Sequence, residues 1–147
     1  MRFAYDAMLG KLAKYLRVLG FDAVYLRNLQ ALERYKQEDD PRYLLTRRRQ
    51  LVKYERTIYI KAETVRKQLT ELKPTIRPAI DPQKILTRCI NCNVPLVDAE
   101  KKAIEHRVPE FVFHSYSSFK ACPSCSHIYW QGTHTAHMNE LIDEMVE

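Results

Sequence analysis

The chain has 147 residues, of which 46% are apolar and 29% charged; this suits one compact domain or two small ones and argues against disorder. The sequence contains no run of roughly 18 or more apolar residues, so it predicts no membrane-spanning helix. The first residues, MRFAYDAMLG, hold an acid and a glycine where a secretory signal needs an apolar core. A cytoplasmic location is the simplest interpretation.

The net charge of +6 is unevenly distributed along the chain. Residues 1–80 carry +9, and residues 81–147 carry −3. A basic first part indicates an anionic partner, most often nucleic acid. A basic surface without any partner is the alternative, and charge alone does not choose between the two.

Strand and helix patterns alternate through the first part of the chain. Apolar residues at helical spacing predict a helix over residues 9–19, ended by Gly20, with Lys11, Lys14 and Arg17 on its other faces. Further helices are predicted at residues 29–38, 47–53 and 63–73. Strands are predicted at residues 1–4, 23–26, 43–46 and 57–61. This order predicts a parallel sheet flanked by helices.

Three prolines, Pro74, Pro78 and Pro82, interrupt this alternation and place a boundary between two modules, residues 1–80 and 81–147. The second module has short strand-like pieces around paired cysteines. A final helix is predicted from about residue 135 to residue 146.

All four cysteines lie in two CxxC pairs, Cys89 with Cys92 and Cys122 with Cys125. Two such turns can direct four thiolates at one tetrahedral zinc ion. Disulfides and a redox CxxC are the alternatives. Disulfides are disfavoured because the chain shows no secretory signal, and a single redox centre would not need a second pair of cysteines. With four sulfur ligands the zinc has no open position, so its role is structural.

The residues after each pair fit the same interpretation. Asn93 and Ser126 fall where zinc knuckles turn tightly, although glycine is more usual there. His127 lies close enough to the second pair to compete as a ligand, but a surface or hydrogen-bonding histidine is the simpler interpretation because four thiolates suffice.

Three stretches of the chain carry a family resemblance: FAYDAMLGKLAKYLRVLGFDAVYL, RCINCNVPL and FKACPSCSHIYWQGTHTAHM. Together they resemble the Mut7-C RNase domain family, a PIN-like nuclease fold fused to a zinc ribbon. Smaller matches are Gln68-Leu69, Arg107-Val108-Pro109 and residues 132–134. The implied fold is α/β: a PIN-like parallel sheet flanked by helices in residues 1–80, then a small C-terminal zinc ribbon and helix in residues 81–147.

The resemblance also implies a metal-dependent ribonuclease that holds Mg²⁺ or Mn²⁺ with carboxylates at the carboxyl ends of the strands. Asp6 matches the first of these carboxylates, and Glu63 is the second candidate for catalysis, although an acid is also expected at a helix start. The family usually reads LTRDREL where this chain reads LTRRRQL, so Arg48 stands at an aspartate position. The acidic pair expected before the second helix is also missing from residues 27–31.

We therefore expect Arg48 to replace a metal ligand and to pair with Asp6, because a guanidinium supplies the charge that the metal would supply. Arg47 and Arg49 are expected to point elsewhere, toward phosphate. The alternative is that all three arginines are surface residues of a helix start. The residues assigned to nucleic-acid binding are Arg47, Arg48, Arg49, Lys11 and Lys14.

Three functions remain open at this level. The first is a ribonuclease that uses Mg²⁺ or Mn²⁺ at Asp6, the second an inactive module that binds RNA or a ribonucleoprotein, and the third a protein-binding adaptor. Exposed aromatic residues would favour the second, since bases stack on rings. Trp130 matches the family's Tyr-Trp motif and is interpreted as ribbon core rather than as a stacking platform.

Overall fold

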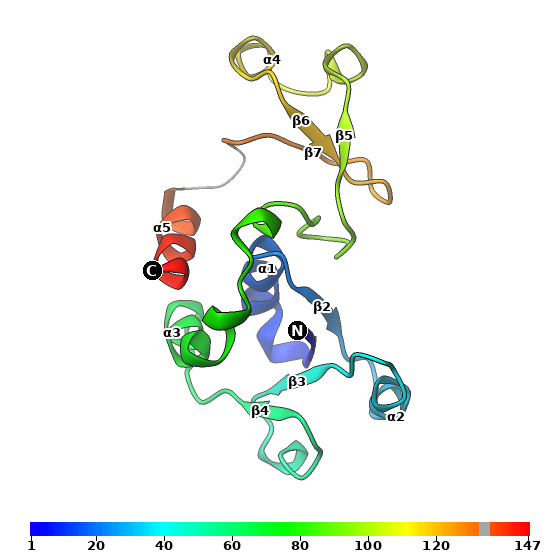
Figure 1. The fold of residues 1–147 in the computed structure, drawn as a ribbon, viewed down its shortest axis with the longest axis vertical. Helices are drawn as coiled ribbons and strands as arrows, with labels where there is room; N and C mark the ends of the chain where they lie inside the picture. The colour runs from blue at the N-terminus through cyan, green and yellow to red at the C-terminus, as the bar shows by residue number, and fades with distance from the viewer. Residues whose placement is uncertain (133–135) are drawn as a thin grey trace.

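The computed structural model describes residues 1–132 and 136–147 and consists of an α/β layer followed by a small antiparallel ribbon (Figure 1). Four parallel strands form the first sheet in the order β2-β1-β3-β4. Their bounds are β1 Arg2–Tyr5, β2 Asp22–Tyr25, β3 Tyr43–Thr46 and β4 Thr57–Tyr59. The predicted parallel sheet is confirmed.

The register of the sheet brings four strand ends to one edge. Tyr5 pairs with Tyr25 of β2 on one side and with Leu45 of β3 on the other. Thr46 at the end of β3 pairs with Tyr59 at the end of β4. The residues that follow these strands therefore emerge together at the carboxyl edge, where α/β sheets bind ligands.

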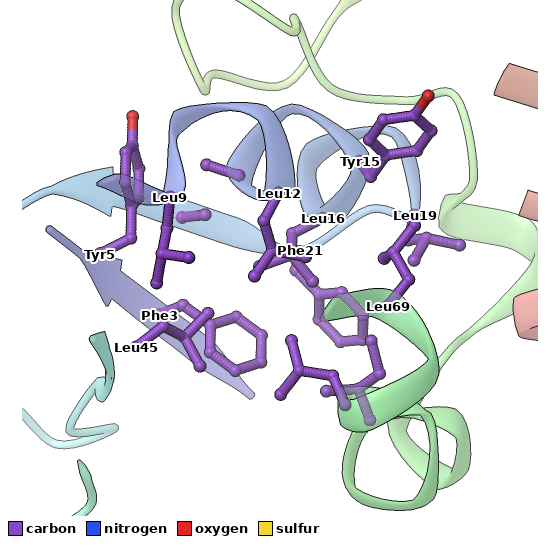
Figure 2. Close-up of a cluster of buried hydrophobic side chains, with 14 of the residues drawn as sticks. Phe3, Tyr5, Leu9, Leu12, Tyr15, Leu16, Leu19, Phe21, Leu45 and Leu69 are labelled. Carbon is purple, nitrogen blue, oxygen red and sulfur yellow. The ribbon is translucent and has the colours of Figure 1, made fainter. Parts of the chain in front are cut away.

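The main core lies between the sheet and two helices, α1 (Gly10–Val18) and α3 (Val65–Ile76). Figure 2 shows Leu12 and Leu16 of α1 beside Phe3 and Phe21. The rings of Phe3 and Phe21 meet edge to face, with centroids 5.5 Å apart. Burial of this apolar face is the main force that holds the helices to the sheet.

Gly20 ends the first helix region, as the sequence predicts. It has a left-handed backbone with φ of +97°, and a Cβ there would meet the Lys84 carbonyl oxygen at 2.6 Å. The linker after α3 therefore passes directly over this turn, and a side chain at position 20 would force it away.

Two predicted helices differ from the observed ones. The helix predicted at 63–73 spans Val65–Ile76: Pro74 removes one helical N–H donor, but the helix continues past it and buries Ile76 fully in the core. The helix predicted at 47–53 is only a short 3-10 turn, Arg49–Leu51. Its first backbone N–H groups are taken by side chains of Asp6 and Thr46, so the chain stays extended until Arg49. The remaining helix of this part, α2, spans Gln30–Lys36.

The second part of the chain forms a three-stranded antiparallel sheet, β5-β6-β7, with a short helix beside it. The bounds are β5 Val97–Ala99, α4 Glu110–Ser115, β6 Phe119–Ala121 and β7 Ile128–Tyr129. We call residues 87–130, which contain these elements and the four cysteines, the cysteine ribbon.

The C-terminal helix α5 (Ala136–Val146) returns to the first part of the molecule and lies beside α3 (Figure 1). Its residues Leu141, Ile142 and Met145 join the core of the parallel sheet. This helix is predicted to start at about residue 135, and one of the family matches covers residues 132–134. Both fall partly on residues 133–135, which lie outside the described residues. The boundary at residue 80 stays a prediction. In the described part of the chain, no helix is both long and apolar enough to cross a bilayer.

Candidate functional site

Asp6 follows β1 at the carboxyl edge of the sheet, and only 3% of the residue is exposed. Its Oδ1 accepts a hydrogen bond from the Met8 N–H at 3.2 Å, which fixes the turn before α1. Its Oδ2 accepts from the Thr46 hydroxyl and from the Arg47 N–H, the latter at 3.2 Å. Both carboxylate oxygens are therefore engaged, and Asp6 joins the ends of β1 and β3.

Arg48 pairs with Asp6, as predicted. Its Nε lies 3.7 Å from Asp6 Oδ2. The side chain of Arg48 is 44% exposed, whereas that of Asp6 is 4% exposed. The arginine thus covers the carboxylate from the solvent side and supplies a fixed positive charge above it.

The two neighbouring arginines do different things. Arg47 is half-buried, and its Nη2 donates to the Lys61 carbonyl oxygen at 3.2 Å, so it ties β3 to the segment after β4. Arg49 is exposed, and its guanidinium lies 5.5 Å from the centre of the Tyr59 ring. Arg48 and Arg49 are therefore the arginines of this run that face solvent.

The remaining predicted residues of the edge are exposed. Lys11 and Lys14 both lie on the solvent side of α1, and Glu63 lies before α3. Across residues 1–132 and 136–147, the only group of three or more His, Cys, Asp or Glu side chains placed to share a metal is the cysteine group. Asp6 and Glu63 thus belong to no carboxylate cluster, and a catalytic role for either stays a prediction.

Thr46 is a site residue that the sequence did not single out. It is fully buried, donates its hydroxyl hydrogen to Asp6 and accepts from the Arg48 N–H at 3.0 Å. A threonine directly after the apolar pair Leu44-Leu45 was the available signal, but the same residue type is common in strands for packing reasons alone.

Arg17 was expected on an outer face of its helix, and this prediction is wrong. The residue is 8% exposed. Its guanidinium donates to the Ala23 carbonyl oxygen at 3.0 and 2.8 Å, to the Ile90 carbonyl oxygen at 2.7 Å and to the Tyr5 hydroxyl at 3.3 Å. These buried acceptors compensate the cost of burying the charge, which helical spacing alone cannot reveal.

The second site is the group of four cysteines, whose sulfur atoms all lie within 4.8 Å of one another. None of the four forms a disulfide. Cys89 Sγ and Cys125 Sγ are 3.8 Å apart, close to the ~3.8 Å that a regular tetrahedron requires when each metal–sulfur distance is about 2.3 Å. The arrangement fits a structural four-thiolate metal site.

The two CxxC turns have the same backbone geometry. Asn93 and Ser126, the residues after each pair, have left-handed φ angles of 60° and 66°. The Asn93 N–H bonds to the Cys89 carbonyl at 3.0 Å, and the Ser126 N–H bonds to the Cys122 carbonyl at 2.9 Å. The tight turn predicted at these two positions is confirmed.

Hydrogen bonds set the acidity of the thiols. Burial alone would raise the pKa of Cys122, but the N–H groups of Cys125 and Ser124 donate to its sulfur at 3.3 Å each and bring the pKa down to about 7. A hydrogen bond with Cys125 raises the pKa of Cys92 to about 12. A bound cation would displace the thiol protons, because cysteine binds metal ions as the thiolate.

Histidine is not part of the described metal group. The His127 ring packs edge to face on Tyr129, with centroids 4.7 Å apart. The Tyr129 hydroxyl lies 3.2 Å from Cys89 Sγ and accepts from the Ile90 N–H at 3.1 Å. His127 thus supports the tyrosine that contacts the sulfur group.

Asn93 also joins the cysteine ribbon to the parallel sheet. Its amide oxygen accepts from the Ala23 N–H at 3.0 Å, and its amide nitrogen donates to Asp22 Oδ1 at 2.7 Å. Burial raises the pKa of Asp22, but hydrogen bonds from Arg42 and Asn93 outweigh it, so the pKa lies below its usual value. The asparagine side chain at this turn therefore makes two hydrogen bonds to β2 that a glycine could not make.

Comparison with known proteins adds one family. A family model described as the Mut7-C RNAse domain matches residues 1–142, which is nearly the whole chain. No curated protein and no solved structure gives a significant match to this chain.

Proposed function

Because this chain belongs to the Mut7-C RNase domain family, a family of ribonuclease-like domains, we propose that it binds RNA at the carboxyl edge of its parallel sheet and does not cleave it by a metal-dependent reaction. The observation that carries the proposal is the ion pair between Arg48 and Asp6. The negative charge on which metal-dependent cleavage would rely is already neutralised by the protein.

The contacts of Asp6 argue against a catalytic metal. Mg²⁺ and Mn²⁺ need several oxygen ligands, and catalysis needs a metal-bound water beside the phosphodiester. Both oxygens of Asp6 already accept hydrogen bonds, and the Arg48 guanidinium lies 3.7 Å from one of them. A divalent cation would have to displace these donors and approach against the charge of the arginine.

The same edge has groups that suit RNA binding. Arg48, Arg49 and Lys61 are exposed and can neutralise phosphates. Tyr25, at the end of β2, is 46% exposed, and its ring lies 5.8 Å from that of Tyr5. An exposed ring among cations suits a single strand, because bases stack on rings while phosphates meet the charges.

The test compares wild type with Asp6→Asn and Arg48→Asp in Mn²⁺, with labelled single-stranded RNA. We expect wild type to bind the RNA without cutting it. Arg48→Asp should bind RNA several-fold more weakly and Mn²⁺ more tightly, because it replaces a cation by an acid. Arg34→Asp, the same charge change on the exposed side of α2, is the matched control. Robust wild-type cleavage that vanishes in Asp6→Asn would overturn the proposal.

For the second site we propose that the bound ion is zinc, which is the usual partner of four thiolates at tetrahedral spacing. The 3.8 Å sulfur separation and the paired turns support this choice. The thiols are free of disulfides, which suits a reducing compartment such as the cytoplasm. When bound, the metal supplies cross-linking rather than catalysis, because four sulfurs leave no open position.

A further inference from the structure

A cavity of about 430 Å³ lies between the end of α1, the linker and the cysteine ribbon. Val18 of α1, Ile85 and Leu86 of the linker, and Ile90 of the first cysteine turn give it apolar walls. This volume falls in the range of small-ligand sites, about 300–1,000 Å³. The cavity lies at the opposite end of α1 from Asp6, so it is separate from the site at the sheet edge.

The other lining residues give the cavity a specific chemical character. Trp130 contributes a half-buried ring and Tyr129 a buried one, and Arg88 and Lys120 contribute cations. Gln83 and Gln131 add amides, which can donate and accept hydrogen bonds. None of the lining residues within the described chain is acidic. An anionic ligand with a flat, hydrogen-bonding ring fits this set better than an apolar peptide does.

Both cations can still reach a ligand. The Lys120 ammonium lies 2.9 Å from Asp98 Oδ1, but this pair is solvent-exposed, and such pairs are weak and exchangeable. Arg88 uses Nη1 to donate to the Asn93 carbonyl oxygen at 2.7 Å, and its charge also helps to lower the pKa of Asp22. A guanidinium has five N–H donors, so this bond leaves others for a phosphate.

We propose that this cavity binds one unpaired nucleotide of a single-stranded RNA, with the base against Trp130 and the phosphate between Arg88 and Lys120. The inference rests on the proposed function, since RNA is taken as the ligand of the chain. Trp130 would then serve both as ribbon core and as a stacking surface, because it packs on the ribbon's apolar cluster and also lines the cavity.

Trp130 is the single tryptophan of the chain, so its fluorescence reports on this cavity directly. The probe is a short oligouridylate, with uridine monophosphate and polyglutamate as comparison ligands. Total RNA affinity is measured in parallel by anisotropy of the labelled oligonucleotide. We expect the oligouridylate to quench Trp130, uridine monophosphate to need a much higher concentration, and polyglutamate to leave the signal unchanged.

Two variants address the cavity without touching the sheet edge. Ser118→Phe places a ring at an exposed lining position, and Lys120→Gln removes one cation. Each should weaken the quenching transition about tenfold, a loss in keeping with one stacked base or phosphate contact. Lys102→Gln, an exposed lysine of the same ribbon outside the lining, is the matched control and should behave as wild type. Metal content and thermal midpoint show that each variant is folded.

The outcomes separate this inference from the proposed function. The cavity assignment alone is overturned if anisotropy shows RNA binding without quenching of Trp130. It is also overturned if RNA quenches Ser118→Phe and Lys120→Gln as it does wild type. Equal quenching by uridine monophosphate assigns the cavity to free nucleotides, and quenching by polyglutamate assigns it to peptides or charge; either result overturns it too. If the oligouridylate neither binds nor quenches, both proposals fail.

Discussion

Arg17 Nη1 donates a 2.7 Å hydrogen bond to the carbonyl oxygen of Ile90, so the last turn of α1 is tied to the first cysteine turn. The same guanidinium reaches the Tyr5 hydroxyl at 3.3 Å, one residue before Asp6. The cysteine group and the carboxyl edge of the sheet, where we propose that RNA binds, therefore both lie next to contacts of this one buried arginine. This bond is one of the contacts that join the cysteine ribbon to the first part of the molecule.

Replacing Arg17 by methionine should lower the free energy of unfolding by about 2–4 kcal/mol, because the buried Ala23 carbonyl and the partly buried Ile90 carbonyl lose their donor. Urea denaturation followed by circular dichroism measures the change. Lys14→Met, on the exposed side of the same helix, should stay within about 0.5 kcal/mol of wild type. Similar losses in the two variants would show that the Arg17 bonds contribute nothing specific.

Asn93 should stabilise the folded protein more than a glycine at the same turn would. Asn93→Gly keeps the left-handed backbone but loses the bonds to Ala23 and Asp22, so we expect it to cost about 1–2 kcal/mol. Asn93→Ala should cost about 1 kcal/mol more, because alanine resists this backbone conformation. Ser126→Gly, the same test in the second cysteine turn, should be neutral or stabilising. A stabilising Asn93→Gly would contradict the bridging role.

The lowered pKa of Asp22 predicts that part of the free energy of unfolding is lost in acid. Its pKa is lowered in the folded protein, because hydrogen bonds from Arg42 at 2.7 and 3.0 Å and from Asn93 outweigh burial. The stabilisation is therefore present above the usual carboxyl pKa of 3.8 and lost as the pH falls through the lower folded value.

Asp22→Asn removes this dependence and should lower the free energy of unfolding by about 1.5–3 kcal/mol at pH 7. The difference from wild type should shrink in chemical denaturation below about pH 4. Asp81→Asn, a capping acid in the linker without an ion pair among the described contacts, is the comparison. A difference that persists unchanged at low pH would count against the Asp22 assignment.

Metal removal should unfold the cysteine ribbon while leaving the parallel sheet largely intact. Metal analysis should find about one zinc per chain. A chelator, or Cys92→Ser, should shift the fluorescence of Trp130 and remove the near-ultraviolet signal of the ribbon, because this part has a small core of its own. Ser117→Ala, at an exposed position of the same ribbon, keeps all four sulfurs and serves as control. A metal-free protein with a folded ribbon would refute the structural role.

RNA affinity should fall steeply with added salt, since each neutralised phosphate releases counterions. Arg48→Ala with Arg49→Ala should reduce the slope of log K against log salt by about 1.4, which is about 0.7 for each lost phosphate contact on a single strand. Arg47→Ala should change the salt slope less than these variants do. Its effect on RNA binding should come mainly from the lost contact with the Lys61 carbonyl. Lys67→Ala, exposed on α3, should leave the slope unchanged. Equal slopes for all variants would place the RNA on another surface.

Much of the architecture was predictable because it depends on local pattern. The alternating elements of the first part follow from apolar periodicity, and Gly20 follows from its place after the last apolar helical position. The cysteine group follows from spacing, since two CxxC turns bring their sulfurs together in few ways. The pairing of Arg48 with Asp6 followed from the family resemblance, which places both residues at positions of metal-binding acids, and the structure puts them after neighbouring strands.

Only the tertiary structure decided the rest, because the partners concerned lie far apart in the chain. The Arg17 bond to Ile90 spans 73 residues and the Asn93 bond to Asp22 spans 71, and no sequence periodicity encodes such a pair. Likewise, the apolar face of α5 predicts a helix but not the surface that it covers. The sequence by itself determined most of the elements, the four cysteines that meet in one group, and the arginine that stands at position 48 where the family has an acid. Packing around α1 determined which polar groups became buried and satisfied, since a buried donor must find an acceptor wherever the fold offers one.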